Sequence, residues 1–140
     1  MVTSTTFVTM EINRAAILAK LNDEVYCLKP NQGRISLPII NRICKKMQHE
    51  LKFKPICVSS DNLIIDGHHR YISSIMSNFK IEIISDYPKP TELNDFYWNN
   101  VKFINEDWDS AAKIKMLNEE DASYNGLKIE EVESIIKTNY

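Results

Sequence analysis

The stretch from Leu63 to Tyr71 constrains the fold of this chain more than any other part of the sequence. The apolar run Leu63 to Ile65 predicts a short strand that is buried on both faces. Asp66-Gly67 predicts a tight turn, because Gly adopts backbone conformations that other residues avoid. After the turn, apolar residues recur at helical spacing, and they are Tyr71, Ile72, Ile75, Met76 and Phe79. The sequence therefore predicts a strand, a turn and a helix whose first turn carries His68, His69 and Arg70.

This strand–turn–helix unit favours an anion site at the start of the helix. The first N–H groups of a helix lack internal partners and carry partial positive charge. Gly67 lets a ligand approach the backbone, and the planar guanidinium group of Arg70 can bind two phosphate oxygens. His68 and His69 are candidates both for phosphate binding and for catalysis. Asp66 is a further catalytic candidate, and it could also hold Mg²⁺ together with phosphate oxygens.

Each of these residues also has a purely structural interpretation. Asp66 could be the N-cap of the helix, with its side chain accepting from backbone N–H groups. Arg70 could form an ordinary surface ion pair. Two adjacent histidines cannot share one face of a helix, so we expect at most one of them to point directly at a ligand.

The motif Asp66-Gly67-His68-His69-Arg70-Tyr71 resembles the signature of the ParB/sulfiredoxin superfamily, and it is most similar to the D-G-H-H-R branch that contains free-serine kinases. The similarity covers about residues 25 to 87, including Lys54–Val58 before the motif and Ile81–Ile84 after it. The resemblance implies a compact α/β (α+β) domain with a mixed sheet.

The same resemblance implies a ligand, which is a nucleotide or a phosphorylated small molecule. The cofactor would be ATP or another NTP with Mg²⁺, and the reaction would be phosphoryl transfer or NTP hydrolysis. A nuclease that acts on DNA phosphodiesters is one alternative, and a non-catalytic binding or regulatory module is another. In the serine-kinase branch the loop at 29–34 carries a catalytic Glu, whereas this sequence has Gln32, whose amide cannot accept a proton. Whether the protein is an enzyme is therefore open at this point.

Arg34 is the residue of that loop that we expect to contact a phosphate, with a solvated loop residue as the alternative. The Lys45-Lys46 pair on the following helix is interpreted as part of a solvent-exposed face. The cysteines Cys27, Cys44 and Cys57 are widely spaced in apolar runs and are predicted to be small buried residues. Sulfiredoxins need a Cys where this chain has His68, which argues against thiol chemistry.

The composition excludes several classes of protein. The chain has 140 residues and a net charge of −2, whereas domains that bind bulk DNA by charge are strongly basic. DNA remains a possible partner through a local patch. The sequence has no zinc motif and no haem motif, and it has no apolar run of membrane-spanning length. We therefore expect a cytoplasmic protein with no membrane contact.

The sequence divides into a core domain at 1–90 and an acidic, mainly helical extension at 91–140 that packs on it. Within the core we expect strands at 7–10, 25–28, 55–58, 63–65 and 81–84, the last of them buried, with helices near 12–21, 37–51 and 71–79. In the extension we expect a short helix at 91–98, a strand at 101–104, a helix capped near Asp107 or Asp109, and a helix at 129–137. The aromatic residues Phe96, Tyr97, Trp98 and Trp108 are predicted to pack on the core, or to form an interface with a second copy or another protein.

Overall fold

The computed structural model describes residues 11–24, 27–90 and 96–137, and it has the mixed α+β fold that the sequence predicts. Its helices are α1 (Arg14–Asn22), α2 (Leu37–Gln48), α3 (His68–Met76), α4 (Ala111–Asn125) and α5 (Ile129–Ile136), with a 3-10 turn at Trp98–Asn100. Its strands are β1 (Arg34–Ser36), β2 (Ile56–Val58), β3 (Ile64–Asp66), β4 (Ile83–Ile84) and β5 (Lys102–Ile104). Within these ranges, no helix is both long enough and apolar enough to cross a bilayer.

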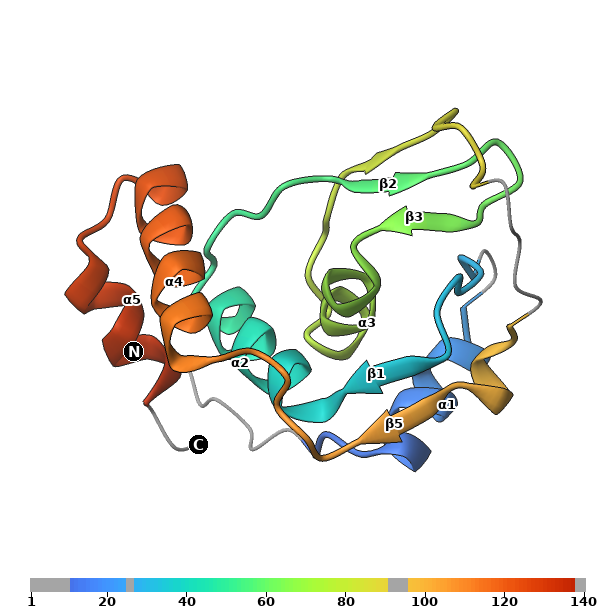
Figure 1. The fold of residues 1–140 in the computed structure, drawn as a ribbon, viewed down its shortest axis with the longest axis horizontal. Coiled ribbons are helices and arrows are strands. Elements are labelled where there is room, and N and C mark those ends of the chain that lie inside the picture. The colour runs from blue at the N-terminus through green and yellow to red at the C-terminus, as the bar shows by residue number, and fades with distance from the viewer. Residues whose placement is uncertain (1–10, 25–26, 91–95, 138–140) are drawn as a thin grey trace, which may run out of the picture.

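The strands form two small sheets on opposite sides of α3 (Figure 1). In one sheet, β2 is central, pairing antiparallel with β3 and parallel with β4. In the other, β1 pairs parallel with β5. Since β1 comes from the predicted core and β5 from the predicted extension, this second sheet ties distant parts of the chain together.

Helix α3 lies at the centre of the main hydrophobic cluster. Its Tyr71 and Ile72 are buried together with Ile17 of α1, Ile40 of α2 and Ile64 of β3. The side chain of Trp98 stacks on Tyr71, and its Nε1 donates to the carbonyl of Leu28 at 2.8 Å. Trp98 and Val101 both belong to this cluster, so the chain after residue 95 contributes to the core before it forms α4 and α5.

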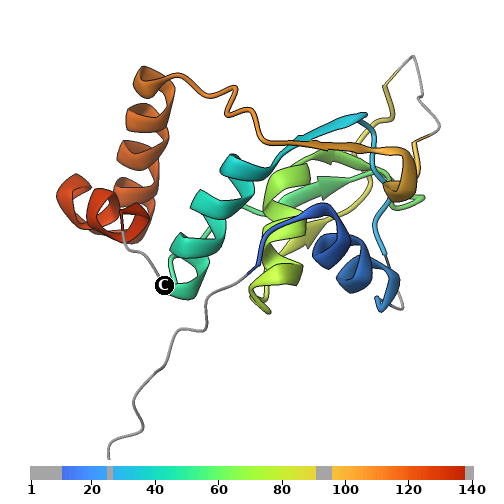
Figure 2. The ribbon, with the colours of Figure 1, turned by 90° about the horizontal axis from the view of Figure 1, so that it is seen from below.

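Helices α4 and α5 lie on the side of α2 that is away from α1 (Figure 2), and α5 packs directly on α2. They have a small cluster of their own, made by Leu51, Ala122 and Val132. Gly126 ends α4 in the left-handed conformation, with φ 65°, as expected for an Asn-Gly pair at a helix end. Because this second cluster is small, polar contacts to α2 contribute strongly to the position of α4.

Several predicted elements are confirmed, with small shifts at their ends. Ser36 caps α2 as its hydroxyl accepts from Ile39 N, with Pro38 in the first turn. The expected helix near Asp107 or Asp109 instead starts after Ser110, whose hydroxyl accepts from Lys113 N. The predicted loop at 29–34 ends in a strand, because Arg34 pairs with Lys102 in the β1–β5 sheet.

Other predictions differ from the structure or fall outside it. The prediction that 81–84 is a buried strand is wrong, because β4 is a sheet edge with both residues exposed. The expected strand at 25–28 is not seen in its described residues, 27 and 28, and residues 25 and 26 lie outside the described ranges. The nearest pairing is an isolated bridge between Lys29 and Leu63. The expected strand at 7–10 and most of the expected helix at 91–98 also lie outside them.

Candidate functional site

The start of α3 has the geometry expected of an anion site. Gly67 is the N-cap residue, with φ 109°, and it follows directly on β3. The first helical hydrogen bond runs from Tyr71 N to Gly67 O at 2.8 Å, and no side chain caps the helix. Asp66 therefore does not act as a cap, and the N–H groups of the first turn of α3 keep their donor capacity.

The guanidinium group of Arg70 lies directly over Gly67. A Cβ atom placed on Gly67 would be 2.9 Å from Arg70 Nη2. The same Nη2 donates to the carbonyl of Pro55 at 3.1 Å and pairs with Asp66 Oδ2 at 3.2 Å. Arg70 Nε is buried and has no partner among the described residues. The Arg70 side chain as a whole is 22% exposed, which leaves part of it accessible to an anionic ligand.

We expect Gly67→Ala to destabilise the protein by about 1–3 kcal/mol, because an alanine is strained at this positive φ. The new methyl group would also displace the Arg70 guanidinium group from its place over the turn. Denaturant unfolding of the two proteins measures the effect, and Gly126→Ala provides the control. Gly126 has a positive φ as well, but a Cβ there would meet no atom within 4 Å. Equal losses in both variants would show that Arg70 is not displaced.

His68 and His69 both fasten the chain at 31–36 to the start of α3. Nε2 of His68 accepts from the backbone N–H of Asn31 at 2.9 Å, and Nε2 of His69 accepts from that of Ser36 at 3.0 Å. An imidazole that accepts at Nε2 carries its proton at Nδ1 when neutral. Neither ring can therefore take a proton at Nε2 without breaking its bond to the loop, which limits both residues as catalytic bases.

The surroundings keep both imidazoles neutral. Burial, together with the neighbouring His69, lowers the pKa of His68 to about 4 against the opposing effect of Asp66. Burial also lowers the pKa of His69 to about 4, with Arg42 acting in the same direction and Asp109 against it. The rings of His69 and Trp108 additionally form a T-shaped contact, with the ring centres 5.3 Å apart. At neutral pH the two rings thus serve as uncharged acceptors at Nε2 and as donors at Nδ1.

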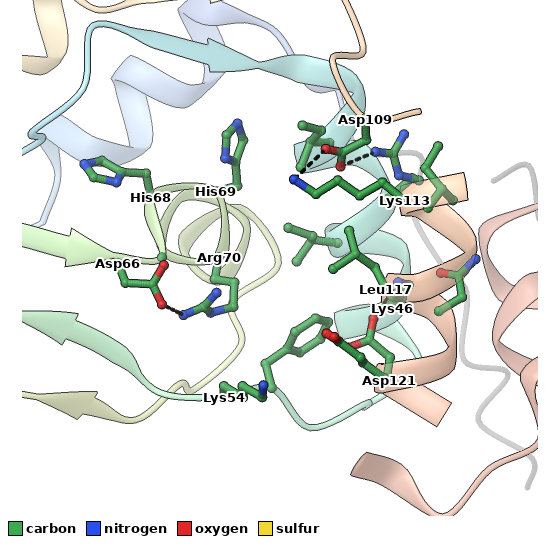
Figure 3. A pocket seen from close by; sticks show the side chains of 18 of the residues that line it. Lys46, Lys54, Asp66, His68, His69, Arg70, Asp109, Lys113, Leu117 and Asp121 are labelled. Atoms are coloured by element: carbon green, nitrogen blue, oxygen red, sulfur yellow. Dashed lines mark hydrogen bonds and ion pairs between the residues drawn. The ribbon is translucent and has the colours of Figure 1, made fainter. Parts of the chain in front are cut away.

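A pocket of about 510 Å³ opens beside these residues, between α3 on one side and α2 and α4 on the other. In Figure 3, Lys113, Leu117 and Asp121 of α4 face Asp66, His69 and Arg70 across this space. Positively charged side chains line it on several sides, and they are Arg42, Lys46, Lys54, Arg70 and Lys113. The acidic lining residues are Asp66, Asp109, Glu120 and Asp121.

Ion pairs between α2 and the C-terminal part of the chain hold the far wall of the pocket. Arg42 contacts the carboxylates of Asp107 and Asp109, and Asp109 also lies 3.5 Å from Lys113 Nζ. Lys46 Nζ donates to Asp121 Oδ2 at 2.6 Å. Two of the lining carboxylates are therefore neutralised by cations of the same wall, while Arg70 and Lys54 approach from the opposite side.

The structure brings together the predicted residues at 66–70 but not Arg34. Arg34 lies on β1, is 61% exposed and pairs with Glu106 at 3.7 Å, and it does not line the pocket. The lysine and arginine residues of α2 and α4 were not identified as site residues from the sequence. Lys46, which we interpreted as solvent-exposed, is only 4% exposed. The sequence feature that indicates its burial is its position on the apolar stripe of the helix, because Lys46 follows Ile39 and Ile43 at helical spacing.

The residues around Asp66 offer little to a metal ion by themselves. No group of three or more His, Cys, Asp or Glu side chains that could hold a metal occurs in the described part of the chain. The Asp66 side chain is 71% exposed, and its carboxylate pairs with Arg70. One carboxylate fits a Mg²⁺ ion only where phosphate oxygens and water supply the other ligands, which is a common arrangement in phosphate chemistry.

Comparisons of the chain with protein-family models, with curated proteins and with solved structures find no match.

Proposed function

We propose that this protein is a ParB-like domain that binds a nucleotide, or another phosphate-bearing small molecule, in the pocket at the start of α3. The observation that carries the proposal is the uncapped first turn of α3, which follows Gly67 and lies under the guanidinium group of Arg70. A phosphate would accept from the N–H groups of residues 68–70 and from Arg70. Lys54, which also lines the pocket, adds positive charge for further phosphates.

The dimensions of the pocket support a small ligand. Sites for small molecules typically enclose about 300–1,000 Å³, and this pocket has about 510 Å³. Helix α4 forms one wall of this pocket, which keeps it to the size of a small molecule. A free nucleotide is therefore the leading ligand, and the nuclease is the weaker alternative.

For catalysis, we propose phosphoryl transfer or NTP hydrolysis with Asp66 as the acid–base or Mg²⁺-binding residue. Its carboxylate is exposed beside the proposed phosphate position, whereas Nε2 of each histidine is already engaged. When bound, a Mg²⁺ ion would neutralise phosphate charge and orient the reacting phosphate. Asp66 would hold that ion, and Arg70 would keep the carboxylate in position.

A binding module without turnover is the second candidate. It is favoured by the neutral, hydrogen-bonded state of both histidines and by Gln32, an amide that lines the pocket where a catalytic Glu would be expected. The two candidates share the binding site and differ only in chemistry. A turnover assay with the bound nucleotide separates them, because only the enzyme consumes the ligand, and Asp66→Asn should then abolish that activity.

Thermal unfolding with a panel of nucleotides and Mg²⁺ tests the binding proposal. A ligand at about 100 times its dissociation constant should stabilise the native protein by roughly 2.7 kcal/mol, which is a shift of a few degrees in Tm. We expect Arg70→Ala to lose this shift. Arg34→Ala is the matched control, because it removes an arginine of the same charge that lies outside the pocket. If both variants respond like the native protein, the phosphate does not bind at Arg70.

A further inference from the structure

Trp108 is a large aromatic residue that lines the pocket and is 41% exposed. A single exposed apolar side chain needs no functional explanation by itself. Trp108 differs because it lies beside the proposed phosphate site, with its ring centre 5.3 Å from that of His69 in the first turn of α3. This T-shaped contact covers at most one face of the indole, so the rest of the ring can meet a ligand.

The chain on both sides of Trp108 is fixed to α2. Nη2 of Arg42 donates to Asp107 Oδ1 and to Asp109 Oδ2, both at 3.1 Å. The backbone N–H of Asp109 also donates to Asp107 Oδ1, at 3.0 Å. The indole is therefore held at the pocket before a ligand arrives, and a preorganised ring loses less conformational freedom on binding.

The cations of the pocket indicate how a nucleotide would be oriented. In Figure 3, His69 and Lys54 lie on opposite sides of Arg70. Phosphates linked to the one at Arg70 would extend toward Lys54, because its ammonium group compensates their charge. The other end of the ligand would then lie toward His69, and hence toward Trp108.

We propose that Trp108 stacks on the base of the bound nucleotide, with the phosphates extending from the start of α3 toward Lys54. This inference rests on the phosphate site proposed above, and it narrows the ligand from any small phosphate to a nucleoside phosphate. Stacking on an aromatic side chain tolerates every base, because each base has a π-face. Trp108 therefore favours nucleoside phosphates over inorganic phosphates without selecting a particular base.

Phe53 and Tyr124 also line the pocket, but neither fits the base as well. Phe53 packs against the second hydrophobic cluster. Tyr124 is exposed, and the next residue, Asn125, accepts from Lys52 N at 2.6 Å and donates to Lys52 O at 3.1 Å. Tyr124 therefore lies at the end of the pocket near Lys54, where the phosphates are proposed to lie.

Calorimetric titration with ATP and with tripolyphosphate, each with Mg²⁺, tests the proposal. Trp108→Ala should weaken ATP binding roughly 5- to 150-fold, which corresponds to about 1–3 kcal/mol of stacking. It should leave tripolyphosphate binding nearly unchanged. Trp108→Phe keeps an aromatic face and should retain most of the ATP affinity. Tyr124→Ala is the matched control, because it removes an exposed aromatic ring of the same pocket and should leave both ligands nearly unaffected.

Tryptophan emission provides a second readout of the same contact. The chain has two tryptophans, of which Trp98 is buried and Trp108 is exposed. We expect ATP to quench the emission of the native protein and tripolyphosphate to leave it unchanged. Trp108→Phe should lose this quenching while it still binds ATP.

Three results would overturn the stacking proposal and leave the phosphate site intact. They are an unchanged ATP affinity in Trp108→Ala, an equal loss of both ligands in that variant, and a selective loss of ATP binding in Tyr124→Ala. The equal loss would show that the indole only supports the site through His69, and the last result would place the base at the opposite end of the pocket. In each case tripolyphosphate would still bind the native protein and be lost in Arg70→Ala. A native protein that binds neither ligand refutes both proposals.

Discussion

Acidification from pH 7 to pH 4 should remove about 6 kcal/mol of stability from this protein through His68 and His69. An unfolded histidine has a pKa near 6.5, whereas burial holds the folded pKa of each ring at about 4. The unfolded chain therefore binds more protons in this range, and stability falls as the pH decreases. By pH 4 the loss is about 3 kcal/mol for each ring. Above about pH 7 the contribution is almost fully present.

Urea unfolding at several pH values between 4 and 7 measures this loss. The double variant His68→Gln/His69→Gln is the control, because glutamine keeps an acceptor for the N–H groups of Asn31 and Ser36 but does not titrate. Its stability should change far less over the same range. Arg42 lowers the pKa of Asp107 below its usual value. The stability that Asp107 contributes is therefore lost mainly below about pH 4, outside this window. An equally steep loss in the double variant would assign the pH dependence to other groups.

Removing the carboxylate of Asp121 should have the second-largest effect, a loss of about 3 kcal/mol or more. Lys46 is buried, and its ammonium group depends on Asp121 for compensation. Breaking one side of a buried ion pair leaves an unpaired buried charge, which typically costs about 3–5 kcal/mol. Because this pair joins α2 to α4, we also expect α4 to lose its fixed position over the pocket.

Asp121→Asn tests this effect by denaturant unfolding together with hydrogen exchange of the α4 amides. The double variant Lys46→Met/Asp121→Leu is the informative partner, because replacing both charges by apolar groups avoids the unpaired ammonium. It should recover most of the lost stability. A single variant as stable as the native protein would mean that Lys46 reaches water when its partner is removed.

The region around Asp66 could be predicted from the sequence because its signals are local. The change from an apolar run to helical spacing, with Gly67 between them, placed β3 and α3 to within a few residues. The opposite wall of the pocket could not be predicted in this way. Lys46 looks like a solvent-exposed lysine until Asp121 is placed beside it, and the two are 75 positions apart in the chain.

The histidines show a second limit of sequence reasoning. Their residue type and position suggested catalysis, but their role depends on which atoms of the loop at 31–36 reach Nε2, and that depends on the tertiary fold. Ile83 and Ile84 show the same limit for residues that were predicted to be buried. Their apolar side chains predicted burial, yet no further strand covers the β4 edge in the described residues.

The most direct test of the central claim is an amide ¹H–¹⁵N NMR titration of the protein with ATP and Mg²⁺, and with pyrophosphate as a probe without a base. If a phosphate binds at the first turn of α3, the backbone amides of residues 67–70 should show the largest shifts with both ligands. The Arg70→Ala variant should lose these shifts, and Arg34→Ala should keep them. Shifts that are largest elsewhere, or absent with both ligands at millimolar concentration, would contradict a phosphate site at this helix.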